Sequence, residues 1–172
     1  MRSYLGTNVG TYIENQLLGA KKYVKICSPW ISPIYASRLV DLAKRGVNVW
    51  VMLQIRGKPN SQNETFDVSR KSYNILKEKG GILKRVIGFL KKEKTEPILR
   101  IIAVDSEKYG FDLAHAKIYV VDGEYAVVGS VNLTETGLWK NLEYILVFEG
   151  SDAKVIEEDY DRLWRAYYGG LR

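Results

Sequence analysis

The only histidine of the chain lies in a short stretch of residues whose types suit reaction at a phosphate ester. His115 is followed by Lys117 and Asp122, and then by Ser130 and Asn132. A neutral imidazole is a nucleophile, an ammonium group neutralises an anion, and hydroxyl and amide groups donate hydrogen bonds to anionic oxygens. This combination indicates attack on a phosphodiester.

The residues around this stretch predict a β-hairpin. Residues 117–121 are rich in β-branched and aromatic side chains, and residues 125–129 form a second run of this kind. Between the two runs, Asp122-Gly123 is a strong signal for a two-residue turn. Gly129, at the end of the returning strand, leaves room for the close approach of a ligand or of a second backbone.

Such a hairpin would gather the polar side chains at one of its ends. Because alternate residues of a strand share a face, His115 points the same way as Lys117. The antiparallel strand carries Ser130 and Asn132 back to the same end, where these two also share a face. We therefore expect the four side chains to converge on one patch.

This stretch resembles the signature of the phospholipase D superfamily, which reads His-x-Lys-x4-Asp-x6-Gly-Ser-x-Asn. Every fixed position of that signature is matched, by His115, Lys117, Asp122, Gly129, Ser130 and Asn132. Glu143 stands where members of the family often carry a carboxylate that pairs with the motif histidine, and the corner Ser28-Pro29-Trp30 is also similar. The chain has one copy of the motif, which resembles the small bacterial and archaeal nucleases that work as homodimers.

The resemblance implies a mechanism that needs neither a metal nor another cofactor. Lys117, Asn132 and Ser130 would bind the non-bridging oxygens of the phosphate. His115 would attack phosphorus and form a phosphohistidine, while Glu143 accepts a hydrogen bond from the other ring nitrogen. The leaving oxygen needs a general acid, and one chain offers no second histidine, so the copy in a partner subunit would supply it.

Each of these residues also has a simpler interpretation. A lone histidine beside a strand is usually structural, and Lys117 alone would be a solvated strand residue. Ser130 and Asn132 alone would be ordinary turn residues, and Glu143 an exposed strand charge. Full agreement with the motif favours function for all of them. Asp122 is a turn residue in either case, and we expect it to hold the hairpin and support the other motif residues rather than to touch substrate.

Composition sets outer limits on the class of protein. With 172 residues, 46% hydrophobic and 27% charged, the chain is typical of one soluble globular domain over residues 1–172. Cys27 is the only cysteine, which excludes an intrachain disulfide and, with a single histidine, makes a zinc cage implausible. The first residues lack a secretory signal and no run is long enough to span a membrane, so we expect a cytoplasmic protein without integral membrane association.

Strand and helix patterns alternate along the chain, which predicts an α/β fold with a mixed sheet flanked by helices on both faces. The expected helices are 9–21, 33–45, 68–79 and 152–168, the third of them stopped by Gly80-Gly81. Besides the hairpin, the expected strands are 23–27, 47–53, 98–104 and 144–148. Residues 57–65 read as a loop, and 82–90 as either strand or helix.

The net charge of +6 is unevenly placed. Glu78, Glu93 and Glu96 are outnumbered by the basic residues between Arg70 and Arg100, at positions 70, 71, 77, 79, 84, 85, 91, 92, 94 and 100. Such a region would attract a polyanion, although a solvated lysine-rich helix face explains it equally well. The sequence therefore predicts a homodimeric endonuclease acting on DNA or RNA. Two alternatives remain: a hydrolase of phospholipids or other small phosphodiesters, and a nucleic-acid-binding module with little cleavage.

Overall fold

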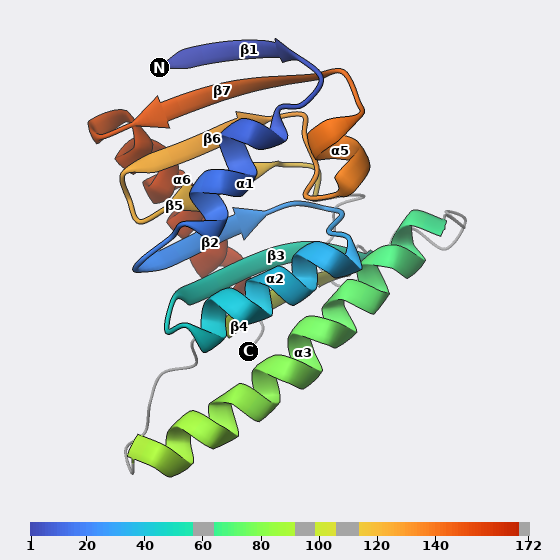
Figure 1. Cartoon of the computed structure of the whole chain (residues 1–172), viewed down its shortest axis with the longest axis vertical. Helices are drawn as coiled ribbons and strands as arrows, with labels where there is room; N and C mark the ends of the chain where they lie inside the picture. The colour runs from blue at the N-terminus through green and yellow to red at the C-terminus, as the bar shows by residue number, and fades with distance from the viewer. Residues whose placement is uncertain (57–63, 92–98, 106–113, 169–172) are drawn as a thin grey trace.

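The computed structural model of the chain describes residues 1–56, 64–91, 99–105 and 114–168, and these form a sheet of seven strands in the order β1-β7-β6-β5-β2-β3-β4 (Figure 1). The strands β2, β3 and β4 are parallel, whereas all the other neighbours are antiparallel, so the sheet is mixed. The strand bounds are β1 Arg2–Gly6, β2 Tyr23–Cys27, β3 Asn48–Arg56, β4 Leu99–Asp105, β5 Ile118–Val121, β6 Tyr125–Gly129 and β7 Glu143–Glu149.

Helices cover both faces of this sheet, as the sequence predicted. One face carries α1, α2 and α3, and the opposite face carries α6 (Figure 1). The short α5 follows the hairpin and packs on α1. The helix bounds are α1 Gly10–Leu18, α2 Pro33–Lys44, α3 Glu64–Lys91, α5 Glu135–Trp139 and α6 Ser151–Tyr168. None of the helices, over their described residues, is apolar for long enough to span a membrane.

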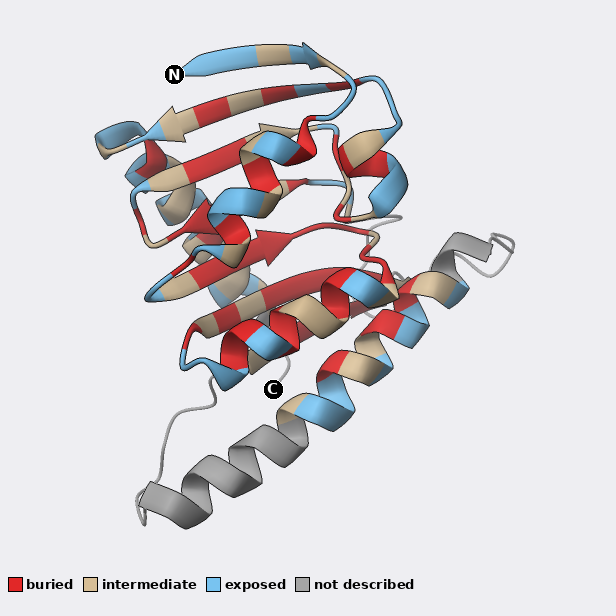
Figure 2. Cartoon of the chain, in the orientation of Figure 1, coloured by how far each residue is buried: buried red, intermediate tan, exposed pale blue. Residues whose placement is uncertain are grey.

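The main hydrophobic core lies between the sheet and the helices α1 and α2, and a smaller one lies under α6 (Figure 2). The strand β7 shows how the chain divides its side chains between them. Ile145 and Val147 are buried in the main core, whereas Phe148 packs towards α6 with Val120 and Ala126. This alternation is the consequence of the period of two along a strand.

The hairpin and the place of its Asp-Gly turn were predicted correctly, although three residues rather than two lie between the paired Val121 and Tyr125. β5 pairs with β6 in antiparallel register, with Ile118 opposite Val128. Asp122 and Gly123 have φ values of 55° and 72°, and left-handed conformations at two successive residues are what a tight type I′ turn requires. An Asp-Gly pair adopts them at low cost.

Gly80-Gly81 does not end the third helix, contrary to our prediction. The helix α3 continues to Lys91, and residues 82–90 are helical. A Cβ atom on Gly80 would lie 2.7 Å from Cδ2 of Leu99, so this glycine permits close packing of the helix on β4. The predicted loop 57–65 lies outside the described residues as far as 63, and its last two residues belong to α3.

Candidate active site

Backbone hydrogen bonds extend the hairpin beyond the first residue of β5 and place the motif residues. The N–H of Gly129 donates to the carbonyl of Lys117 at 3.3 Å, so these two residues stand opposite each other. Three residues before Lys117, the N–H of Ala114 donates to Oε1 of the fully buried Gln54 at 3.0 Å. The segment that carries His115 is therefore fixed on both sides, by β6 and by β3.

Lys117 provides a buried cation next to the backbone of the motif histidine. Its side chain is only 4% exposed, and its Nζ atom donates to the carbonyl oxygen of His115 at 2.8 Å. Burial lowers the pKa of this ammonium group, and the negative charge of Glu143 acts in the opposite direction. Glu143 is thus the countercharge that favours the protonated form of Lys117 at the site.

His115 is exposed at the same end of the sheet, where its ring and that of Trp30 form a T-shaped pair. The two ring centroids are 6.3 Å apart with an interplanar angle of 82°. Partial burial, followed by the nearby positive charge of Lys117, lowers the pKa of His115 below its ordinary value of 6.5. The imidazole is therefore mostly neutral at pH 7, which is the form in which a ring nitrogen can attack phosphorus.

Glu143 and Ser130 are bonded to each other. The hydroxyl of Ser130 donates to Oε2 of Glu143 and accepts a 3.1 Å hydrogen bond from the N–H of Tyr144. The other carboxylate oxygen of Glu143 accepts from Nδ2 of Asn141 at 3.3 Å. Within the described residues no hydrogen bond joins Glu143 to His115, so the pairing of these two residues stays a prediction, as does the contact of Ser130 with a phosphate.

Asn132 lies after β6 on a loop whose backbone is held in place by its neighbours. The carbonyl oxygen of Asn132 accepts from the N–H of Thr134 at 2.8 Å, and a Cβ atom on Gly137 would lie 2.6 Å from that oxygen. The side-chain oxygen is buried and has no hydrogen-bond partner in the part of the chain that the structure describes. A donor from a substrate or from a second chain would satisfy it.

The corner after β2 fixes this loop, a role that the sequence analysis missed. The hydroxyl of the fully buried Ser28 donates to the carbonyl of Trp30 at 2.7 Å and accepts from the N–H of Leu133 at 3.1 Å. The N–H of Ser32 then donates to the carbonyl of Leu133 at 3.0 Å. A serine directly after a buried strand and before a proline was the available signal, because such a hydroxyl needs a partner inside the protein.

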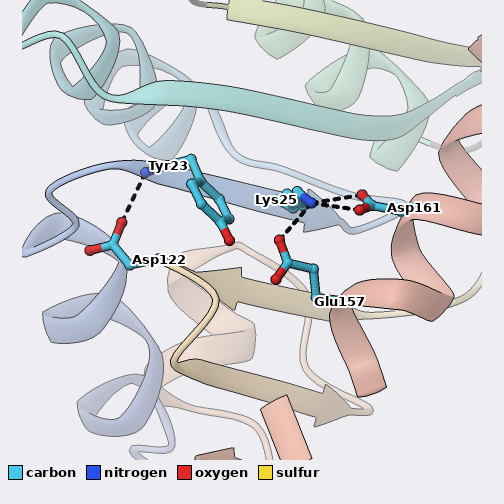
Figure 3. Close-up of polar contacts among 5 residues, drawn as sticks. All are labelled: Tyr23, Lys25, Asp122, Glu157 and Asp161. Carbon is cyan, nitrogen blue, oxygen red and sulfur yellow. Dashed lines mark hydrogen bonds and ion pairs between the residues drawn. The ribbon is translucent and has the colours of Figure 1, made fainter. Parts of the chain in front are cut away.

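Asp122 lies away from the other motif residues, at the opposite end of β5 from His115 and Lys117. The four residues of that strand rise about 3.3 Å each, so roughly 13 Å of strand separates it from the histidine end. Its carboxylate accepts the backbone N–H groups of Lys21, Lys22 and Tyr23 at 2.8–2.9 Å. Figure 3 shows the bond from Tyr23. These bonds agree with the expectation that Asp122 holds the hairpin. That Asp122 belongs to the catalytic set together with the other motif residues stays a prediction.

Gly129 makes room for a second backbone, one of the two alternatives left open by the sequence. A Cβ atom at this position would lie 2.3 Å from the carbonyl oxygen of Tyr144 and 2.9 Å from Cα of Ile145. The strand β7 can therefore approach β6 at the point where Ser130 meets Glu143.

Among the described residues, no group of three or more His, Cys, Asp or Glu side chains is arranged to hold a metal ion.

The fold of the chain is that of several solved structures. The phospholipase D family member Nuc from Salmonella typhimurium superposes with a TM-score of 0.66 and 17% identity, over 98% of this chain and 94% of that one. NucT from Helicobacter pylori superposes with a TM-score of 0.59 and the same identity and coverage. At such identities the likeness concerns the fold.

The sequence itself also matches known proteins. Cardiolipin synthase A of Klebsiella pneumoniae is 39% identical over 66 residues, as is that of Erwinia tasmaniensis. In each case the match covers 35% of this chain but only 14% of the relative. The family model described as "Cardiolipin synthase, PLD-like domain" matches residues 13–164, nearly the whole chain, so the protein belongs to this family of the phospholipase D superfamily.

Proposed function

We propose that the protein is a metal-independent phosphodiesterase that acts through a phosphohistidine intermediate and cleaves nucleic acid as a homodimer. The observation that carries this proposal is the pair formed by His115 and Lys117. A solvent-accessible imidazole has its pKa lowered by partial burial and by the charge of a buried ammonium group, which is itself bonded to the backbone carbonyl of the same histidine. A nucleophile in its neutral form next to a fixed positive charge is what attack on an anionic ester requires.

The chemistry would proceed in two displacements at phosphorus. A ring nitrogen of His115 bonds to phosphorus while the bond from phosphorus to the leaving oxygen breaks, and that oxygen takes a proton from an imidazolium. A water molecule then attacks the phosphohistidine, gives its proton to the same, now neutral, second imidazole, and the bond between nitrogen and phosphorus breaks. Lys117 stabilises the charge on the phosphate oxygens in both steps.

The second imidazole would come from the partner subunit's His115, because each chain has one histidine. The surface beside the site supports this assembly. Leu142 and Tyr144, on either side of Glu143, have exposed fractions of 72% and 49%. These exposed apolar side chains lie next to a site that lacks its second histidine. If a two-fold axis passes beside them, the same side chains of two subunits can pack against each other.

A nucleic-acid substrate is supported by the position of the basic helix α3. Its first half is bonded to the corner that holds Trp30, through Ser69 to the carbonyl of Pro29 at 3.3 Å and through Ser72 to the carbonyl of Ile31 at 2.6 Å. The exposed basic residues between these serines and after them are Arg70, Lys71, Lys77 and Lys79. The side chains at 84, 85, 91, 92 and 94 lie outside the described ones. Positive charge therefore begins next to the site, where a polyanion would approach.

The test is a substrate panel at equal protein concentration in the presence of EDTA. We expect cleavage of single-stranded DNA or RNA or of plasmid, with phosphate trapped on the wild-type protein and none on His115→Ala. Activity that EDTA removes and magnesium restores would contradict the metal-independent mechanism. Mixing His115→Ala with wild-type subunits should reduce activity more than dilution does, and a linear loss would contradict the shared site.

The second candidate is the same chemistry on a phospholipid, and the sequence relatives favour it. The family model and the 39% identical relatives carry the name cardiolipin synthase, and the phosphatidylserine synthase of Haemophilus influenzae has a similar fold, with a TM-score of 0.53. Turnover of phosphatidylglycerol vesicles without cleavage of nucleic acid in the same panel would favour this candidate.

A third candidate is a module that binds nucleic acid with little cleavage. The archaeal chromatin protein TrmBL2, whose structure was described as showing a novel mode of DNA binding, superposes with a TM-score of 0.51. The neutral imidazole beside Lys117 argues against this candidate, because binding alone does not require a nucleophile. A gel shift at nanomolar protein with no cleaved product after prolonged incubation would favour it.

A further inference from the structure

A small pocket opens beside His115 on the face of the sheet that α6 covers. Its volume is about 190 Å³, and the segment 114–116 forms one wall. Cys27, the last residue of β2, and Met52, in the middle of β3, form another, and Leu163 and Tyr167 of α6 complete it. The reacting histidine and an apolar cavity therefore share a boundary.

The side chains that line the pocket suit an uncharged planar ring. Burial raises the pKa of the Cys27 thiol to about 12, although the charge of Lys117 acts against this, so the thiol stays neutral. Cys27 and Met52 are only 1% and 2% exposed and bring two polarisable sulfur atoms, which pack favourably against aromatic rings. Tyr167 adds an aromatic ring, the side chain on which nucleic-acid bases stack.

The size of the pocket decides between the groups that a phosphodiester can carry. Pockets for drug-sized ligands have volumes of roughly 300–1,000 Å³. A volume of about 190 Å³ is therefore suited to a single ring system. The two long chains of a diacylglycerol unit would not fit, whereas one nucleobase would.

We infer that this pocket is a nucleobase subsite, which receives a base of the nucleotide whose phosphate lies at His115. The inference rests on the proposed nuclease function and adds to it a substrate contact away from the phosphate. A base held between the side chains of α6 and the wall formed by Cys27 and Met52 would fix the register of the strand relative to the nucleophile. The enzyme would then prefer single-stranded or locally opened substrate, because a stacked and paired base cannot enter a pocket.

The first test needs no catalysis. The chain has two methionines, so ¹³C-methyl labelling gives one signal from Met52 in the pocket and one from Met1, which precedes β1 and is 74% exposed. Titration with thymidine or adenosine should shift the Met52 signal alone, and titration with ribose should shift neither. A Met52 shift with hexanoylglycerol but not with the nucleosides would overturn the inference, as would no Met52 shift at all.

The second test uses a short oligonucleotide in which one linkage can be cleaved, compared with the same oligonucleotide lacking the base next to that linkage. Removing the base should lower kcat/KM about tenfold, the size expected for one stacked base. Leu163→Phe, which fills the pocket, should cause a similar loss with the complete substrate and almost none with the abasic one. The matched control is Val155→Phe on the same helix, where the side chain is 59% exposed and outside the pocket.

The two tests separate failure of the inference from failure of the proposed function. Equal losses for Leu163→Phe on both oligonucleotides would overturn the subsite, because the variant would then act on the position of His115. Cleavage of neither oligonucleotide by the wild-type protein would count against the nuclease function, and the Met52 titration would still decide whether a base enters the pocket.

Discussion

The hydroxyl of Ser130 donates its hydrogen bond to the carboxylate of Glu143, so two residues of the candidate site act as one unit. Glu143 is 7% exposed and lies close enough to Lys117 to oppose the lowering of its pKa. The serine thus holds the carboxylate that keeps the buried cation charged. We therefore expect Lys117 to contact the phosphate and Ser130 to act as a positioning residue.

Ser130→Ala should lower kcat/KM by about 10- to 100-fold, the range expected when a hydrogen bond to a charged group is lost. Glu143→Gln should cost at least as much, because it removes the countercharge of Lys117. Since the two side chains act together, the double variant should be little worse than Glu143→Gln alone. Steady-state kinetics on the four proteins measure this coupling, and losses that multiply would show that Ser130 acts independently.

The lowered pKa of His115 predicts a pH profile for the first displacement. The nucleophile is active when neutral, so the rate of phosphoenzyme formation should rise with pH and reach its plateau through a pKa below 6.5. An aryl phosphodiester such as bis-p-nitrophenyl phosphate isolates this step, because its leaving group needs no proton. The burst of p-nitrophenol between pH 4.5 and 8 is the measurement, and an inflection above 6.5 would contradict the assigned state of the ring.

The sequence could predict those parts of the candidate site that depend on contacts between residues close together along the chain. The motif lies within one hairpin. Strand periodicity was therefore enough to predict that His115 and Lys117 lie at one end of it, and the Asp-Gly turn was enough to predict that β6 returns to that end. The bond between Ser130 and Glu143 joins two strands through a close approach at Gly129, which no local pattern reveals. The role of Ser28 likewise depends on Leu133, a residue far along the chain.

The elements that the sequence analysis missed have weak patterns of their own. The strand β1 is an edge strand in which Tyr4 packs on Tyr12 and Leu5 is 70% exposed, so its side chains do not alternate clearly between apolar and polar. The helix α5 is five residues long, and the N–H of Gly137 donates a hydrogen bond to the hydroxyl oxygen of its N-cap residue, Thr134. The length of α3 was underestimated because Gly80 was interpreted from the low helix propensity of glycine. The close packing of α3 on Leu99 explains why a glycine stands at this position.

Gly129→Ala should destabilise the protein, because the added methyl group would collide with the backbone of β7. The carbonyl oxygen of Tyr144 lies 2.3 Å from the ideal Cβ position, and backbone cannot move as a flexible side chain can. We expect a loss of about 3 kcal/mol in the free energy of unfolding, the upper part of the range for overpacking. Gly6→Ala is the control, since no atom lies within 4 Å of its Cβ position. Urea denaturation compares the two, and equal effects would argue against the collision.

Asp122 should affect stability rather than catalysis. Burial raises the pKa of its carboxyl group, but the N–H groups of Lys21, Tyr23 and Lys22 lower it by more, so the folded-state pKa lies below the ordinary value of 3.8. The carboxylate therefore stabilises the fold above pH 3.8, and this contribution is lost as the pH falls through the lower, folded-state pKa.

Two variants separate the carboxylate of Asp122 from its backbone conformation. Asp122→Asn tolerates the φ of 55° and keeps one acceptor oxygen, so we expect a loss of about 1 kcal/mol. Asp122→Ala loses both properties and should cost about 3 kcal/mol. Urea denaturation at pH 7 and pH 3 should show the difference from wild type shrinking at the lower pH, with kcat at pH 7 unchanged in Asp122→Asn. A kcat reduced a hundredfold in folded Asp122→Asn would restore the residue to the site.

The ion pairs of Lys25 anchor α6 over the sheet and thereby the helix that bounds the pocket beside His115. The Nζ atom of Lys25 lies 2.6 Å from Glu157 and 2.7 Å from Asp161, and the lysine side chain is 11% exposed (Figure 3). Lys25→Met should lower the free energy of unfolding by about 2 kcal/mol, less than the 3–5 kcal/mol of a fully buried pair, because Asp161 is 36% exposed.

The variant Lys44→Met is the matched control, because the pair of Lys44 with Asp41 has side-chain exposures of 55% and 65%. Its effect should stay within about 0.5 kcal/mol. If the cost of Lys25→Met arises from the carboxylates left without a countercharge, adding Glu157→Gln should recover part of it. A double variant less stable than Lys25→Met would instead assign the loss to packing of the lysine stem between Tyr23 and Trp50, whose ring centroids lie 5.2 and 5.6 Å from Nζ.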